Sequence, residues 1–225
     1  MENFKELSAA KAAVYELLTY PYYKEINAEY IEKLQKSSSL LKSFLNVKDN
    51  SDYSQGLSSL ENALLSDENS DFLAGEFAQL FLVKNINQNI PGVEPVESVY
   101  LSPKHMIMQE ERDQVLEMYY KECLERNKDF KENEDHISAE LMFMYKLNMF
   151  LIKSLNEDNQ DEFIRLYGVY IEFLQNHLMK WCGKLCDDII RLTKSQYYKS
   201  IAYLTKGFIN IDFYITMEYK KALGC

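Results

Sequence analysis

Apolar residues recur at helical spacing along almost the whole chain, and this periodicity constrains the fold more than any other feature. They return every three or four positions, the spacing that places side chains on one face of a helix. No segment alternates between apolar and polar residues over the length of a strand. Glycine and proline number only 7 and 4 in 225 residues, too few turn signals for a sandwich of short strands. The sequence therefore predicts an all-α protein, a single compact bundle-like domain without a sheet.

Proline and polar residues mark the expected helix ends. Pro21 stops the first helix, and the serine patch at 37–39 is a weak point or break in the second. The pair Ser102-Pro103 is typical of a helix start, because serine caps free N–H groups and proline fits the first helical position. We therefore expect a helix from this pair to about Arg126.

A polar stretch around Glu132-Asn133-Glu134 divides the helical pattern. We expect an N-terminal helical half of residues 1–126, a linker or hinge loop of residues 127–134 and a C-terminal helical half of residues 135–225, packed as one domain. Such a linker allows two chains to exchange halves. A monomer and a domain-exchanged homodimer are both left open.

The charge balance bears on the class of partner. Acidic residues number 35 against 25 basic ones, which gives a formal net charge of −10. A phosphate backbone is repelled by this field, so we expect no nucleic acid as a partner. A basic, arginine-bearing partner suits the charge better, although acidity also serves solubility alone.

The chain has no feature of a membrane or secreted protein. Its longest apolar run, 141–152, is interrupted by Lys146 and Asn148 and is too short to span a bilayer. The N-terminus lacks the basic and apolar regions of a secretory signal. The four cysteines form no recognisable disulfide framework. We expect a cytoplasmic protein without stable membrane insertion.

One group of residues has the composition of a metal site. His177, Cys182 and Cys186 lie close in sequence, but His177 and Cys182 are five positions apart and point away from each other on a helix. A structural zinc site needs four converging ligands, so we expect no metal. The sequence also lacks a glycine-rich phosphate loop and the common hydrolase motifs. We therefore do not expect an enzyme.

The pair Asp135-His136 is the most distinctive local motif. A carboxylate beside an imidazole suggests catalysis, but neighbouring helical side chains point about 100° apart. The plainer interpretation is that Asp135 caps a helix that His136 opens. Glu140 follows four residues later and shares a helix face with His136. These carboxylates suit the forked guanidinium group of an arginine.

Three blocks together resemble the TorD/DmsD/NarJ family of redox-enzyme maturation chaperones, and most closely its TorD and DmsD branches. The first is an aromatic stretch, 76–81, followed by the proline-containing loop 94–100. The second, residues 134–144, is similar to the family's Asp-His-x-x-x-Glu-Leu-x-Phe-Met signature. The third, residues 177–181, is similar to its His-Leu-x-x-Trp element. Each block alone is weak, but their order and spacing are specific.

The resemblance implies a function as well as an all-helical fold. Such chaperones bind the twin-arginine signal peptide or N-terminal tail of a molybdenum-cofactor oxidoreductase. They assist cofactor insertion and prevent premature export. The expected partner is thus a molybdoenzyme precursor; formate dehydrogenase and trimethylamine-oxide-type or dimethyl-sulfoxide-type reductases all fit. No cofactor is expected, and the resemblance leaves weak guanine-nucleotide binding open.

The resemblance also carries eight residues over to a signal-peptide site. Two aromatic residues are expected to line an apolar groove, two carboxylates to meet arginine, and the others to shape or tune the contact. In that order, they are Phe77 and Phe81; Asp135 and Glu140; and Glu97, Ser98, Tyr100 and His136. The alternative for the two phenylalanines is burial in the core, since aromatic residues are usually mostly buried. Tyr100 and Glu140 have a structural alternative too, bonding across the loop.

Two other functions stay in competition with the chaperone. One is a metal- or nucleotide-dependent enzyme, and the other is a general helical scaffold for protein interactions. Measurements of metal content and of nucleotide turnover identify the enzyme. Co-purification with an unrelated protein, without leader binding, identifies the second.

Overall fold

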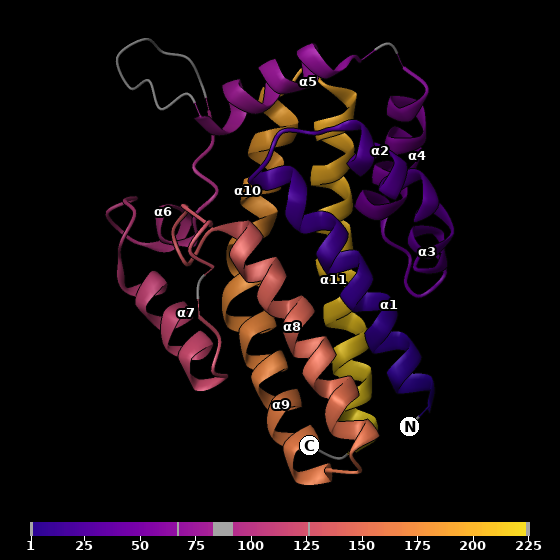
Figure 1. Cartoon of the computed structure of the whole chain (residues 1–225), viewed down its shortest axis with the longest axis vertical. Coiled ribbons are helices and arrows are strands. Elements are labelled where there is room, and N and C mark those ends of the chain that lie inside the picture. Colours follow the sequence, from indigo (N-terminus) through magenta and orange to yellow (C-terminus); the bar gives the residue numbers. More distant parts are fainter. Residues whose placement is uncertain (1, 67, 83–91, 126, 224–225) are drawn as a thin grey trace. The chain divides into compact units, whose positions relative to one another are not determined.

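The computed structural model describes residues 2–66, 68–82, 92–125 and 127–223, most of which are helical (Figure 1). No strand forms within these ranges, and the all-α prediction is confirmed. Contacts between Cα atoms divide the chain into two units. Unit 1 consists of Met1–Tyr20 and Pro95–Cys182, and unit 2 of Pro21–Glu94 and Gly183–Cys225. Unit 1 includes residues on both sides of the loop 127–134. The division into halves 1–126 and 135–225 stays a prediction.

Unit 1 is built around two helices that pack along each other, α1 (Glu2–Thr19) and α8 (Ile137–Asn156) (Figure 1). Helix α9 (Gln160–Phe173) packs against α8. A π-helical turn, η3 (Leu174–Leu178), joins α9 to α10 (Met179–Leu192) without a break. Such widened turns inside long helices often lie at functional sites. Here the turn contains His177, a residue of the candidate site.

Aromatic contacts hold α1 against α9 within unit 1. The ring of Phe4 lies edge-on to Phe163, with 5.1 Å between centroids, and 5.7 Å from Tyr167. The ammonium group of Lys11 lies 4.3 Å from the centre of the Tyr170 ring. Edge-on rings and a cation over a ring face are both favourable geometries. The apolar face that the sequence predicted for the first helix is therefore its packed face.

The helix expected from Ser102 to about Arg126 is wrong in its first third. Instead, the short helix α6 (Glu97–Leu101) ends at Ser102, and α7 (Glu110–Lys121) begins eight residues later. The connecting turn contains two non-glycine residues with positive φ, 51° at His105 and 61° at Met108. A right-handed helix cannot continue through such a backbone. Cys123, with φ of 54°, likewise follows the end of α7.

Unit 2 contains α2 (Ala28–Lys36), α3 (Ser38–Ser43), α4 (Ser51–Leu64), α5 (Ser70–Phe77) and α11 (Gln196–Leu223). It also contains the single turn η2 (Ala78–Leu82) and, from Pro21 on, the turn η1 (Tyr20–Tyr22). The predicted break in the serine patch is confirmed between α2 and α3. Asparagine side chains cap α2, α4 and α5 by accepting a backbone N–H, a role that suits their short polar groups. Neither α11 nor any other described helix is long and apolar enough to cross a membrane.

Helices α4 and α11 approach closely in unit 2, and two glycines make this contact. A Cβ atom added at Gly207 would lie 2.5 Å from the backbone nitrogen of Tyr53, and one at Gly56 would lie 2.6 Å from that of Leu204. Both distances are far inside van der Waals contact, and backbone atoms cannot swing away as a side chain can. The two glycines therefore set the spacing of this helix pair.

We expect Gly207→Ala to lower the free energy of unfolding by about 1–3 kcal/mol, because the new methyl group forces the two helices apart. Urea unfolding followed by circular dichroism measures the change. Gly168→Ala is the matched control, since a Cβ there meets nothing within 4 Å. On this exposed stretch of α9, alanine should stabilise by about 0.5–1 kcal/mol. Equal effects at both positions would contradict the close-contact explanation.

Candidate functional site

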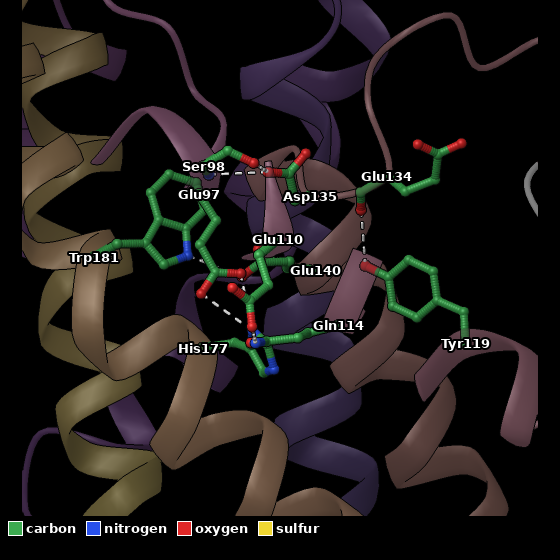
Figure 2. Close-up of polar contacts among 10 residues, drawn as sticks. All are labelled: Glu97, Ser98, Glu110, Gln114, Tyr119, Glu134, Asp135, Glu140, His177 and Trp181. Atoms are coloured by element: carbon green, nitrogen blue, oxygen red, sulfur yellow. Dashed lines mark hydrogen bonds and ion pairs between the residues drawn. The ribbon is translucent and has the colours of Figure 1, made fainter. Parts of the chain in front are cut away.

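Asp135 connects the first turn of α6 to the start of α8. Its Oδ2 atom accepts the backbone N–H of Ser98 at 2.9 Å and also the Ser98 hydroxyl (Figure 2). On either side, the N–H of Glu97 donates to the Asp135 carbonyl and the N–H of Ile137 donates to the Pro95 carbonyl, both at 2.9 Å. These bonds form an isolated antiparallel bridge between Val96 and His136. We call this arrangement the Asp135 clamp.

His136 caps helix α8, one residue later than the sequence indicated. Its Nδ1 atom accepts the N–H of Ser138 at 3.2 Å and lies 2.7 Å from the Ser138 hydroxyl oxygen. Phe130 covers the imidazole, with 6.0 Å between the ring centres. Because only 2% of His136 is exposed, its imidazole acts as part of the fold rather than as a surface group.

A second set of contacts connects α6 and α8 to η3 and the beginning of α10. Nδ1 of His177 lies 2.9 and 3.1 Å from the two carboxyl oxygens of Glu97, and Nε1–H of Trp181 donates to Oε2 of Glu140 at 3.0 Å (Figure 2). The ring of Tyr100 lies 5.6 Å from the Trp181 ring. Glu97, Glu140 and Asp135 are each at most 1% exposed. Three carboxyl groups are therefore buried together.

Burial dominates the electrostatics of this cluster. It raises the pKa of Glu140 well above 4.5, and the nearby carboxyl groups of Glu97 and Asp135 raise it further. Burial also raises the pKa of Glu97, which the contact with His177 partly offsets. The pKa of Asp135 is raised by burial and lowered by the bonds from Ser98. Oε1 of Glu140 and Oδ1 of Asp135 are buried without a hydrogen-bond partner. The cluster therefore favours proton uptake.

Helix α7 is attached to the residue just before the clamp. Nε of Arg112 donates to Oε2 of Glu134 at 2.8 Å. The Tyr119 hydroxyl donates to the Glu134 carbonyl at 3.1 Å (Figure 2). The Tyr119 ring packs against Phe143 of α8 and Phe173 of α9, with centroids 4.7 and 6.2 Å apart. The signature block thus holds both α6 and α7 in place.

Phe77 and Phe81 lie in unit 2, whereas the other six predicted residues lie in unit 1. Both phenylalanines are buried, and their rings are 5.3 Å apart. Phe81 also contacts Tyr22 and Tyr198, each 6.1 Å away. They therefore belong to the core of unit 2, the alternative that the sequence had left open. A further role in lining a groove stays a prediction.

Comparison with known proteins identifies the family. A family model described as the nitrate reductase delta subunit matches residues 46–187, more than half of the chain. The chain belongs to this family. Over 94% of its length it is 26% identical to "Chaperone protein TorD" of Vibrio atlanticus and 28% identical to that of Psychrobacter sp., covering 97% and 93% of those proteins. The TorD of Vibrio parahaemolyticus is 24% identical over the same share of the chain.

These relatives confirm the resemblance that the signature blocks predicted. These relatives are named as chaperones. Their names support the expectation that this chain is not an enzyme. The site geometry gives little scope for catalysis in its own right. Asp135 is bonded to Ser98, while His136 is bonded to Ser138 as a helix cap. Across the described ranges, no three His, Cys, Asp or Glu side chains are arranged to hold a metal ion.

His177 and Trp181 are not among the eight residues predicted for the site, although both lie inside the buried cluster. The signal was present, since the two residues are four positions apart in the third signature block. Side chains four apart share a helix face, so both were candidates for one site. The sequence pattern gives His177 two other interpretations, as a metal ligand with Cys182 and Cys186 and as the first residue of the third block. Both cysteines are buried, and the imidazole of His177 contacts Glu97.

Proposed function

We propose that this protein is a cytoplasmic chaperone for a molybdenum-cofactor oxidoreductase. It binds the twin-arginine signal peptide or N-terminal tail of that precursor, assists cofactor insertion and prevents premature export. The observation that carries the proposal is the similarity to TorD chaperones along 94% of the chain. The net charge of −10 supports it, because a negative field speeds the encounter with a cationic leader.

Within this function, we assign the buried signature residues a positioning role. The Asp135 clamp and the contacts of Glu97 and Glu140 fix α6 relative to α8. Helix α7 is attached next to the clamp, through Arg112 and Tyr119 to Glu134. Direct contact of Asp135 or Glu140 with an arginine stays a prediction. Since both carboxyl groups are fully buried, that contact requires the residues that cover them to move away first.

Binding of a leader peptide tests the proposal. The probe is a synthetic peptide with two adjacent arginines followed by a leucine- and alanine-rich run, titrated against the full chain by calorimetry. We expect binding that weakens with added salt, because exposed charges are screened. Replacing both arginines by glutamine should lower the affinity at least tenfold, as each charge-assisted hydrogen bond contributes about 1.5–3 kcal/mol. Equal affinity for both peptides would argue against recognition of the arginines.

A further inference from the structure

Three consecutive apolar residues before α7 face solvent. Met106, Ile107 and Met108 are 58%, 41% and 59% exposed. Their turn is held in place, because Nδ1 of His105 lies 2.9 Å from the Val99 carbonyl oxygen, while the Gln109 amide donates to the carbonyls of Ile107 and Met108. Positive φ at His105 and Met108 is an unfavourable backbone conformation for these residues. The chain thus maintains a strained turn that presents apolar side chains to water, a combination typical of binding sites.

One face of α7 continues this apolar surface. Five residues spaced at helical intervals line a shallow hollow of about 460 Å³: Asp113, Leu116, Glu117, Tyr120 and Lys121. Tyr120, at 61% exposure, is the most exposed aromatic residue that the structure describes. Tyrosine offers a large apolar ring with a polar tip, which suits a contact surface.

Charge on this part of unit 1 favours a cationic ligand. The first turn of α7 carries Glu110, Glu111 and Asp113. The basic side chains of the helix are already engaged: Arg112 bonds to Glu134 at 2.8 Å, and Lys121 bonds to Glu117 at the same distance. Glu110 and Glu111 therefore stand in sequence between the exposed turn and the residues of the hollow, and the basic side chains of α7 are bonded to other carboxylates.

We infer that the surface formed by 106–108, Glu110, Glu111 and the hollow of α7 is the docking site for the twin-arginine leader. This α7 surface takes the two guanidinium groups at the acidic first turn and the apolar run on its methionines, isoleucine and tyrosine. Methionine side chains adapt their shape to different apolar partners. The inference rests on the proposed function and names its contact surface.

The dimensions and attachments of α7 fit this assignment. Twelve residues of helix extend about 18 Å, which roughly six residues of extended peptide can span. The helix is fixed through Arg112 and Tyr119 to Glu134, the residue before the Asp135 clamp. Glu134 thereby acts on the ligand by holding the surface that contacts it.

A triple variant tests the assignment: Met106→Ser, Ile107→Ser and Met108→Ser in the full chain. We expect it to bind the synthetic twin-arginine peptide at least about tenfold more weakly, since a few apolar anchors carry most of the affinity of such contacts. The matched control is Met149→Ser with Ile164→Ser, which removes exposed apolar residues from α8 and α9 of the same unit. The control should bind within about twofold of the unaltered chain.

Each outcome is decisive. A folded triple variant that binds as tightly as the unaltered chain overturns the docking site but leaves the proposed function standing. Absence of binding by the unaltered chain overturns both. If light scattering shows a dimer that the triple variant loses while peptide binding persists, the surface serves a second copy of the chain and the inference is overturned. Should the triple variant lose helicity, Tyr120→Ser with Glu110→Gln on the exposed face of α7 provides the same test.

Discussion

Asp135→Ala is expected to lower the free energy of unfolding by about 3 kcal/mol. The change leaves the N–H and the hydroxyl of Ser98 buried without their acceptor, and each unmet buried group costs about 1–3 kcal/mol. Removing a carboxylate that burial disfavours offsets part of this loss. Urea unfolding monitored by circular dichroism gives the difference at pH 7. This result would establish that Asp135 stabilises the fold by attaching the first turn of α6 to the start of α8.

A double-mutant cycle separates the clamp from a general effect of substitution. Ser98→Ala alone removes the hydroxyl but keeps the backbone N–H, so it should cost about 1 kcal/mol. When both residues are replaced, the hydroxyl is no longer left unpaired, and the loss should be smaller than the sum of the single losses by about 0.5–1 kcal/mol. Strictly additive losses would show that the Asp135–Ser98 contact does not contribute to stability.

The spacing of apolar residues was sufficient to predict those helices along which this spacing is not interrupted. Apolar spacing placed the first helix correctly, with its end before Pro21, because few competing signals interrupt it. The expected helix at Ser102 failed because a cap-like residue followed by proline also occurs where a helix ends. Positive φ at His105 and Met108 has no mark in the sequence, as neither is a glycine. The turn is fixed instead by contacts such as His105 with Val99.

The sequence predicted which residues belong to the candidate site, but not that their side chains are buried. The signature block identified Asp135 and Glu140, and an acidic side chain is ordinarily read as a surface group. Their burial depends on partners far along the chain: Asp135 bonds to a residue 37 positions earlier, and Glu140 to one 41 positions later. Such long-range pairing leaves no local pattern. The α7 surface was missed for the opposite reason, because exposed apolar residues look like core residues in a sequence.

Glu140→Gln is expected to change the pH dependence of stability. Burial raises the pKa of Glu140 in the folded protein, so the folded state binds a proton that the unfolded state has released. Between pH 4.5 and the raised folded pKa, unfolding releases that proton, and stability falls as the pH rises. One such proton changes the free energy of unfolding by about 1.4 kcal/mol per pH unit. Glutamine, which is neutral and can still accept the Trp181 N–H, removes this contribution.

The variant should therefore lose less stability than the unaltered chain as the pH rises from 5 to 8, and it should be the more stable of the two at the upper end. Urea unfolding across this pH range measures both curves. Glu6→Gln removes the same charge from an exposed position on α1 and should run parallel to the unaltered chain. Glu140→Ala removes the acceptor of Trp181 and leaves a cavity, so it should cost about 3 kcal/mol at pH 5. At this pH, close to 4.5, the penalty for burying the acid is still small. If the Glu140→Gln curve runs parallel to that of the unaltered chain, the buried carboxyl group does not hold a proton in the folded state.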